Sequence, residues 1–293
     1  MRRVLVPRTL SELWDCLDEA SRGGASPDDG SVSVYAGGTD LLVKMRSGLI
    51  HPSTLVCLDR IGELKEIAEE GDEVRMGACA THARLLRHPS IAEHFPVLAQ
   101  ALRGLGSPLI RNMGTIGGNL CTASPAGDTL PPLYALDARV ELLSRRGRRS
   151  VPVGDFILGP GRTSLETGEI LAAVRVEKPR APEGGCLVHH FEKVGHRNAL
   201  ACSVASLAAL LRLSSPGGVV EKAALAWGSV APTVVVCPEA RRALEGKRPT
   251  LETLREAAVL AREAVDPVTD VRADAEYRRT VSGNLLLRLL CAE

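Results

Sequence analysis

Apolar residues over the first part of the chain alternate in short runs, which is the pattern of β-strands with one buried face. One amphipathic segment interrupts them, and Thr9 and Glu12 at its start have the spacing of a capping box before a helix. We therefore predict a βαββ block over about residues 1–58, whose small sheet needs a neighbour to cover it. The strand-like runs are 4–7, 32–38 and 53–61.

Residues 59–178 predict a second block of mixed strands and helices. Strand-like runs on both sides of Gly71 and Asp72 indicate a hairpin, and a second pair of runs flanks the arginine-rich stretch 145–149. No aromatic residues interleave these arginines, which favours a solvated turn over a nucleic-acid patch. The other expected elements are helices at 81–89 and 90–105 and a strand at 169–179.

The last third of the chain changes to long alternating runs followed by amphipathic helices. Its final helix contains Gly283, which costs about 1 kcal/mol relative to Ala in a helix interior. We therefore predict an α+β protein with one domain over 1–178 and a second over 179–293. The expected strands are 186–194, 202–213 and 219–230, and the expected helices are 238–246, 250–265 and 275–290.

Composition places the chain among ordinary globular proteins. Of its 293 residues 45% are hydrophobic, and the formal net charge of +1 gives no strong field for nucleic acid or anionic lipid. No apolar run approaches the roughly 20 residues that cross a bilayer, and the first residues do not read as a signal peptide. We expect a cytoplasmic protein without nucleic-acid or membrane partners.

The metal-binding residue types are scattered along the chain. The eight cysteines form no C-x-x-C pair, which argues against iron–sulfur clusters, structural zinc and a disulfide framework. His189, His190 and Glu192 are close in sequence, but strand alternation places His190 and Glu192 on one face and His189 on the other. We therefore expect no metal site.

The first of two glycine-rich segments is Tyr35–Arg46, YAGGTDLLVKMR, in which Gly37 and Gly38 stand directly before Thr39. Glycines allow positive φ and let a ligand approach the main chain. Successive N–H groups around such a turn form a concave nest that binds anions, phosphate above all. The segment matches neither a P-loop nor a Rossmann fingerprint.

The second segment, Arg111–Asp128, RNMGTIGGNLCTASPAGD, repeats this pattern more densely. Gly114, Gly117 and Gly118 are surrounded by short polar side chains, and Asp128 ends the run. Two nests and a carboxylate suit a ligand with two phosphates and a sugar, because amides would hold the pyrophosphate and the carboxylate would accept from ribose hydroxyls. The alternative is a pair of tight glycine turns that bind nothing.

Four stretches, which run in order through most of the chain, carry a resemblance to a known family. They are YAGGTDLLVKMR, RNMGTIGGNLCTASPAGDTLPPLYALDARVEL, LAWGSVAPTVVVCPEARRALEG and DVRADAEYRRTVSGNLLLRLL. They resemble the FAD-binding subunits of molybdenum hydroxylases, a group that includes the medium subunit of carbon monoxide dehydrogenase and the flavin subunit of bacterial xanthine dehydrogenase. The resemblance implies an FAD-binding domain of the vanillyl-alcohol-oxidase (PCMH) type in two subdomains, about 1–58 and 59–178. A C-terminal three-stranded antiparallel sheet with helices would follow.

The resemblance also implies the residues of an FAD site. Main-chain groups of the first segment would hold the pyrophosphate, Leu41 would close over the cofactor, Asp128 would bind the ribose and Leu105 would lie against the adenine. Ile170 or Leu171 would press on the flavin ring, and the cation of Lys193 would reach its polar edge and favour reduced flavin. An ordinary surface role for Lys193 is the alternative. The implied residues of the two segments are Ala36, Gly37, Gly38, Thr39, Asp40, Gly114, Thr115, Gly118, Asn119 and Thr122.

The function that the resemblance implies is electron transfer within an oxidoreductase. In the family the substrate is oxidised at a molybdenum centre in a large chain, and electrons pass through two-iron clusters of a small chain to FAD, then to NAD or another acceptor. Ala201 stands where many relatives carry Asp, so no role passes to that position, and no catalytic side chain is expected. Two alternatives stay open: a stand-alone FAD-dependent oxidoreductase of the same superfamily, and a non-catalytic nucleotide-binding assembly module.

Overall fold

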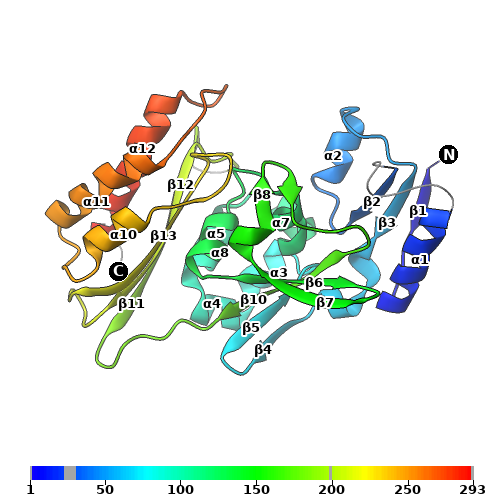
Figure 1. Ribbon diagram of the computed structural model, residues 1–293, viewed down its shortest axis with the longest axis horizontal. Coiled ribbons are helices and arrows are strands. Elements are labelled where there is room, and N and C mark those ends of the chain that lie inside the picture. The colour runs from blue at the N-terminus through cyan, green and yellow to red at the C-terminus, as the bar shows by residue number, and fades with distance from the viewer. Residues whose placement is uncertain (1, 23–30, 198–199, 292–293) are drawn as a thin grey trace.

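The computed structural model describes residues 2–22, 31–197 and 200–291. Within these residues the strands form three larger sheets and one two-stranded sheet. Figure 1 shows the larger sheets side by side along the long axis of the molecule, in the order in which they occur in the chain. Helices accompany all three, so the mixed helix and sheet content expected from the sequence is present.

The first sheet is parallel and consists of β1 (Arg3–Leu5), β3 (Thr54–Cys57) and β2 (Val32–Tyr35), in that spatial order. Helix α1 (Leu10–Arg22) buries Leu13 against Val56, and α2 (Leu41–Arg46) follows the first glycine-rich turn. One half of the expected capping box forms at the start of α1, and the other half is replaced by a bond to the preceding residue. The Glu12 N–H donates to Thr9 Oγ1 at 3.1 Å, but Glu12 Oε2 accepts from the Arg8 N–H at 2.7 Å.

The second sheet is antiparallel, with the strand expected near 169–179 at its centre. Its spatial order is β4 (Ile67–Glu70), β5 (Glu73–Gly77), β10 (Ile170–Glu177), β6 (Arg139–Ser144) and β7 (Gly147–Pro152). The pairs β4–β5 and β6–β7 confirm both expected hairpins. Around the sheet lie α3 (His82–Arg87), α8 (Leu130–Ala135), α9 (Val153–Phe156), β8 (Ile157–Gly159), β9 (Arg162–Thr163) and two 3₁₀ turns, η1 (Leu58–Arg60) and η2 (Gly62–Leu64).

The single helix expected over 90–105 is in fact two helices, α4 (Pro89–His94) and α5 (Pro96–Gly104). Pro96 lacks an N–H and restricts the residue before it, and Phe95 accordingly leaves the helical region, with φ −129° and ψ 55°. Apolar residues on both sides of Pro96 follow one helical pattern, so the sequence did not indicate this break.

The second glycine-rich segment forms two short helices rather than a pair of turns. It contains α6 (Pro108–Met113) and α7 (Ile116–Thr122). Ser107 Oγ and Thr115 Oγ1 cap these helices by accepting from the N–H groups of Ile110 and Gly118, each at 3.1 Å. A Cβ at Gly117 would come within 2.5 Å of Ala78 Cβ, so this glycine lets α7 pack directly on the chain after β5.

The third sheet contains the three long strands expected, β11 (Cys186–Val194), β12 (Ala205–Leu213) and β13 (Val220–Gly228). A fourth strand, β14 (Val235–Val236), pairs with β13, so the expectation of three strands was wrong. Two residues are too few to show alternation. The helices that follow are α10 (Pro238–Leu244), α11 (Leu251–Ala264), α12 (Ala275–Leu287) and the 3₁₀ turn η3 (Arg288–Cys291).

Both faces of the third sheet are covered. In Figure 1 helices α10, α11 and α12 lie on one side, and α5 and α8 of the central part lie on the other. Leu207 and Ala209 of β12 belong to the core under the C-terminal helices, whereas Ala208 belongs to the central core. Gln100 of α5 joins the two parts: its Nε2 donates to the His189 carbonyl at 3.1 Å, and its Oε1 accepts from the Phe191 N–H at 2.6 Å.

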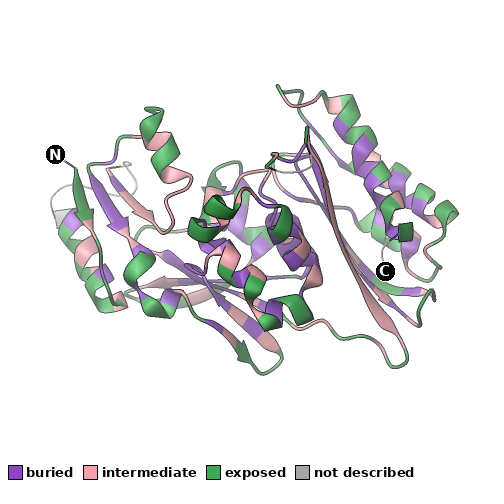
Figure 2. Ribbon diagram, turned by 180° about the vertical axis from the view of Figure 1, so that it is seen from behind, coloured by how far each residue is buried: buried purple, intermediate pink, exposed green. Residues whose placement is uncertain are grey.

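Burial follows the same layers. Figure 2 shows buried residues along the strands and on the inward faces of the helices. Trp227 of β13 is fully buried, and its Nε1 donates to the Ser282 carbonyl at 3.0 Å. Among the described helices none combines the length and apolar composition that a membrane crossing requires. The described residues hold no group of three His, Cys, Asp or Glu side chains placed to bind a metal ion.

Candidate functional site

The two glycine-rich segments lie against each other. A Cβ atom at Gly37 would overlap the carbonyl oxygen of Met113 and would lie 3.2 Å from the nitrogen of Gly114. The turn after β2 and the chain between α6 and α7 therefore meet in van der Waals contact. Only a residue without a side chain permits this close approach. The approach brings the two segments near enough to share one site.

Main-chain N–H groups of the first segment find no acceptor in the part of the chain that the structure describes. Gly38 has φ +70°, a left-handed conformation that costs glycine little. The Leu42 N–H donates to the Gly38 carbonyl at 3.0 Å, but the N–H groups of Gly37–Leu41 have no acceptor among the residues that the structure describes. Successive free N–H groups around a turn form an anion-binding nest, as the sequence predicts for this segment.

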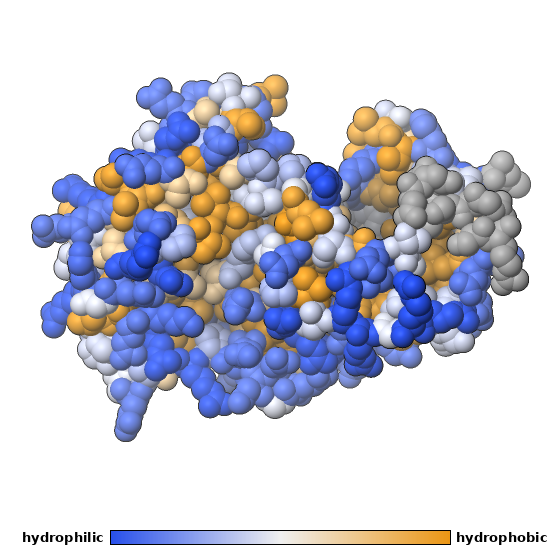
Figure 3. All heavy atoms as spheres, viewed as in Figure 1, coloured by the Kyte–Doolittle hydropathy of each residue, from blue (hydrophilic) through white to orange (hydrophobic). Residues whose placement is uncertain are grey.

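The side chains beside this nest are mostly apolar. Asp40 directs its carboxylate to the Lys44 ammonium at 2.7 Å, so it offers a ligand its N–H rather than its side chain. Leu42 and Val43 are 50% and 63% exposed. Figure 3 shows apolar side chains on the lobe that carries α2, and a hollow between this lobe and the central part of the molecule. A ligand held by the nest would lie beside apolar surface.

Most amides around the glycines of the second segment are paired, contrary to the expectation of a second nest. The N–H groups of Ile116 and Gly117 donate to the carbonyls of Ala80 and Ala78 at 3.1 and 2.9 Å. The Gly118 N–H is taken by the Thr115 side chain. The glycines of this segment therefore serve close packing of α7, and glycine content alone could not distinguish packing from anion binding.

Polar side chains of the second segment are nevertheless directed outward from α7. Asn119 Oδ1 accepts from Thr129 Oγ1 at 2.6 Å, which orients the amide and leaves its NH₂ group for another partner. Asn119 and Thr122 are half-buried, and Gly118 is exposed. The contribution of this segment to a ligand site thus comes from side chains rather than from a ring of N–H groups.

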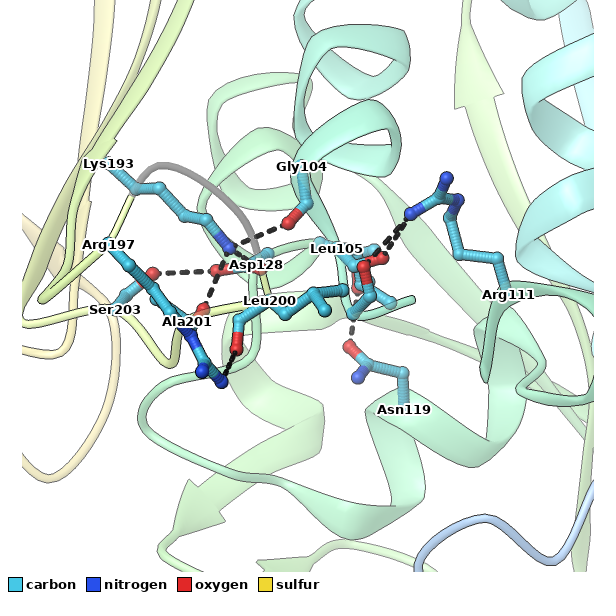
Figure 4. A network of polar contacts seen from close by, with 12 residues as sticks. Gly104, Leu105, Arg111, Asn119, Asp128, Lys193, Arg197, Leu200, Ala201 and Ser203 are labelled. Carbon is cyan, nitrogen blue, oxygen red and sulfur yellow. Dashed lines mark hydrogen bonds and ion pairs between the residues drawn. The ribbon is translucent and has the colours of Figure 1, made fainter. Parts of the chain in front are cut away.

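Asp128 and Lys193 form one ion pair, with 2.6 Å between Oδ2 and Nζ (Figure 4). Their side chains are 8% and 15% exposed. Ser203 Oγ donates to the other carboxylate oxygen of Asp128 at 2.7 Å. The resemblance assigned Asp128 to a ribose and Lys193 to a flavin ring, but the structure places both groups at the same point.

Burial raises the pKa of Asp128 above its ordinary value, while the Lys193 ammonium and the Ser203 hydroxyl oppose this shift. The protonation state of the Asp128 carboxyl group therefore depends on Lys193 and Ser203 rather than on hydration by water. Sequence reasoning missed Ser203, because a serine in an apolar strand-like run gives no signal of its contact with a residue 75 positions earlier.

Leu105 directly follows α5, and an arginine that sequence reasoning missed fixes its position. Arg111 Nη1 donates to the carbonyls of Leu105 and Gly106 at 2.8 and 3.0 Å. Leu105 is 7% exposed. Arg111 begins the second glycine-rich segment, so its place in the motif was visible in the sequence, but its partner was not.

Ile170 and Leu171 are 3% and 4% exposed, at the start of β10. Ile170 belongs to the core under the first sheet and Leu171 to the central core, so their side chains enter different clusters. The pairing of β10 with β6 shifts register directly after Leu171. Contact of either residue with a flavin stays a prediction.

Comparison with known families shows which family the chain belongs to. The family described as FAD binding domain in molybdopterin dehydrogenase matches residues 1–179, and the family described as CO dehydrogenase flavoprotein C-terminal domain matches residues 190–292. The chain belongs to the FAD-binding flavoprotein family of molybdenum hydroxylases. FAD is the cofactor of this family, and its members are subunits of oxidoreductases.

Individual relatives agree over nearly the whole chain. The carbon monoxide dehydrogenase medium chain of Hydrogenophaga pseudoflava is 33% identical over 88% of this chain and 88% of its own. The putative xanthine dehydrogenase FAD-binding subunit of Escherichia coli (strain K12) is 33% identical over 86% and 85%. Among solved structures, carbon monoxide dehydrogenase from Hydrogenophaga pseudoflava superposes with a TM-score of 0.90 at 31% identity, covering 99% of this chain and 96% of that one.

The residues of this site fit the family's cofactor. The pyrophosphate of FAD needs several donors close together, and the N–H groups of Gly37–Leu41, which lack an acceptor in the described part of the chain, would supply them. Asp128 keeps unused acceptor capacity after its bonds to Lys193 and Ser203, because an ionised carboxylate can accept about four hydrogen bonds. The apolar residues of α2 suit the faces of a large aromatic ring system.

Proposed function

We propose that this chain is the FAD-holding electron-transfer subunit of a molybdenum hydroxylase complex. The observation that carries the proposal is the row of N–H groups at Gly37–Leu41, which have no acceptor within residues 2–22, 31–197 and 200–291 and are held in contact with the second glycine-rich segment. A diphosphate bridge is the part of FAD that such a row recognises. Family membership adds independent support, because the match that names FAD covers this segment.

Within this function we propose the following roles for the site residues. Main-chain groups of the first segment hold the pyrophosphate, and the side chains of Asn119 and Thr122 orient the ribityl and phosphate groups beside it. Asp128 accepts from a sugar hydroxyl, Leu105 lies against the adenine, and Leu41, Ile170 or Leu171 bounds the ring system. The remaining proposed contacts are Ala36, Gly114, Thr115 and Gly118.

When bound, FAD supplies both one-electron exchange with iron–sulfur clusters and two-electron transfer to an acceptor such as NAD. The chain's own residues supply binding, orientation and exclusion of water. We propose no general acid or base among them, because the buried carboxyl of Asp128 is already engaged by an ammonium and a hydroxyl.

We propose two partner chains, a molybdenum-cofactor large subunit and a small subunit with two-iron clusters. Relatives described as medium chains of carbon monoxide and glyceraldehyde dehydrogenases support this assembly. The substrate is then set by the large chain, and NAD or another acceptor takes the electrons. The PCMH-type division at about residue 58, the domain boundary at 178 and the cytoplasmic location stay predictions.

The test is the visible spectrum and FAD affinity of the purified chain, wild type against Gly37→Ala. The added Cβ overlaps the Met113 carbonyl and must push the two segments apart, so we expect FAD to bind at least about tenfold more weakly. Gly62→Ala is the matched control, because a Cβ there meets nothing within 4 Å and its φ is not positive.

The alternatives give different results in the same preparation. A colourless protein that takes up no FAD on reconstitution would contradict the proposal and favour a non-catalytic assembly module. Oxidation of a small substrate by the isolated yellow chain would favour a stand-alone oxidoreductase. Equal FAD affinity of wild type and the Gly37 variant would show that the first segment is not the cofactor site.

A further inference from the structure

The ammonium group of Lys193 stands where three separate segments of the chain meet (Figure 4). Its Nζ donates to Asp128 Oδ2 at 2.6 Å, to the Gly104 carbonyl at 2.9 Å and to the Ala201 carbonyl at 3.2 Å. The lysine itself belongs to β11, a strand of the third sheet. One charged group therefore connects that sheet to the end of α5 and to the chain after α7.

These three contacts use the full donor capacity of the side chain. A lysine ammonium has three N–H donors and no acceptor. Each donor already has an oxygen partner in the protein, and the side chain is only 15% exposed. Contact with a flavin ring would require the ammonium to give up one of these partners in a site with little water to replace it.

The segments held by Lys193 carry two of the proposed cofactor contacts. The Gly104 carbonyl immediately precedes Leu105, whose own carbonyl is fixed by Arg111. Asp128 has its second oxygen held by Ser203, which lies two residues after Ala201. Removal of the ammonium would therefore release the Leu105 turn and leave Asp128 buried beside a single hydroxyl donor.

We propose that Lys193 is a positioning residue for the cofactor site, which acts through Asp128 and the Gly104 carbonyl and does not contact the flavin ring. The inference rests on the proposed FAD-binding function and changes the role that family resemblance gives to this lysine. It also gives Ser203 a role, as the second group that holds Asp128 in place.

The experiment compares FAD affinity and flavin properties of full-length wild type and Lys193→Met. Loss of the ammonium leaves a buried carboxyl without its charged partner, so we expect FAD to bind about tenfold more weakly or worse. The midpoint potential and absorption spectrum of the FAD that does bind should equal those of wild type, because no ring contact is lost. Lys193→Arg retains a cation with several donors and should recover part of the affinity.

Lys178→Met is the matched control. Lys178 Nζ lies 2.6 Å from Glu69 Oε2 and donates to the Gly71 carbonyl at 3.1 Å, and its side chain is 19% exposed. A lysine–carboxylate ion pair is thus removed at a distance from the site residues, with the Glu69 partner 44% exposed. This variant should keep wild-type FAD affinity even if it loses stability.

Two further readouts separate positioning from a general loss of stability. FAD affinity should fall as Asp128 becomes protonated, and the midpoint of that fall should move to higher pH in Lys193→Met and, by less, in Ser203→Ala. Among the described residues the groups that oppose the effect of burial on Asp128 are Lys193 and Ser203, so both variants act in the same direction. In the FAD-free chain, hydrogen exchange at 101–106 and 124–130 should accelerate in Lys193→Met and not in Lys178→Met.

Several outcomes would overturn the inference. A changed midpoint potential or spectrum in Lys193→Met with unchanged affinity would place the ammonium on the ring. Unchanged affinity and pH profile in both Lys193→Met and Ser203→Ala would show that the junction does not position the site. If Lys193→Met does not fold, FAD affinity and its pH profile in Ser203→Ala and Lys193→Arg test the inference instead. Failure of wild type to bind FAD would instead refute the proposed function itself.

Discussion

Arg149 holds Glu169 through two parallel hydrogen bonds of 2.7 Å, from Nε to Oε1 and from Nη2 to Oε2. The Glu169 side chain is only 8% exposed, and Nη2 also donates to the Ser164 carbonyl. Arg145, on the same hairpin, reaches Asp15 of α1 at 2.5 Å. The arginines expected at a solvated turn therefore include two that fasten the β6–β7 hairpin to neighbouring segments.

We predict that Arg149→Met destabilises the fold in a pH-dependent way. Hydrogen bonds from Arg149 lower the pKa of Glu169. A carboxyl with a lowered folded-state pKa stabilises the protein above its unfolded pKa of about 4.3 and loses this effect as pH falls. The variant should lose about 1 kcal/mol in urea denaturation at pH 7, a figure reduced for partial exposure, and less below about pH 4. Arg180→Met, which removes an exposed ion pair to Asp72, is the control.

An equal loss of unfolding free energy at pH 7 and below pH 4 would contradict this account. Arg149 should bind a protonated Glu169 more weakly than an ionised Glu169. A loss in Arg180→Met as large as that in Arg149→Met would show that exposed ion pairs matter as much as the bidentate one.

We predict a second acid-sensitive element at His82. Burial lowers the pKa of His82 to about 4, and Arg111 adds to the shift. The unfolded chain binds this proton near pH 6.5 and the folded chain only near pH 4, so stability is constant above about 6.5 and falls as pH drops from there. His82→Asn should flatten the plot of unfolding free energy against pH between 6.5 and 4, whatever its effect at pH 8.

The control for this slope is His51→Asn, because His51 is an exposed histidine. An unchanged slope in His82→Asn would refute the prediction. The His82 ring packs against the second segment, since a Cβ at Gly114 would lie 3.1 Å from His82 Cδ2, so protonation of the ring should also weaken FAD binding below about pH 5 by loosening that segment.

We predict that Gly283→Ala is destabilising although alanine is the better helix former. A Cβ at this position would come within 2.7 Å of the Ala258 carbonyl oxygen and 2.5 Å of Arg262 Nε. The clash should outweigh the gain in propensity and lower the free energy of unfolding by about 1–3 kcal/mol. Gly62→Ala, where no atom is near, should be neutral in the same denaturation experiment.

We predict that Arg111→Met weakens FAD binding about fivefold, since it frees the Leu105 and Gly106 carbonyls from a charged donor. The pKa of His82, followed by NMR, should rise in the same variant because a nearby positive charge is lost. Arg103→Met, at an exposed position on α5, should change neither property. Unaltered FAD affinity with a shifted His82 pKa would separate Arg111 from the cofactor site.

The elements that sequence reasoning predicted well are those with long periodic patterns. The strands β10, β12 and β13 and the helices α10 to α12 are long and contribute many buried residues, and β11 is long and half-buried throughout, so their apolar patterns are uninterrupted. Prediction failed where local chemistry overrides the pattern. Pro96 divides one apolar run into two helices, and the two-residue strand β14 pairs only because β13 is already in place.

The site was predictable in its composition and not in its contacts. Gly37 and Gly38 were identified from their conformational freedom, and the structure gives Gly38 a positive φ and Gly37 a close approach to Met113. The roles of Arg111 and Ser203 depend on residues brought together by folding, which no local pattern encodes. The same glycine signal misled at Gly117, where the missing side chain serves packing against Ala78.

The two-sided burial of β12 has a consequence for how this chain can be divided. A fragment that stops after residue 179 would lack both hydrogen-bond partners of Gln100 on β11. It would also expose to solvent the faces of α5 and α8 that pack on the third sheet. A fragment that begins there would expose the alanine-rich underside of its sheet around Ala208 and Ala226. Although separate families match the two portions, neither should survive expression alone, and gene fission at this point should be tolerated only when both products are made together.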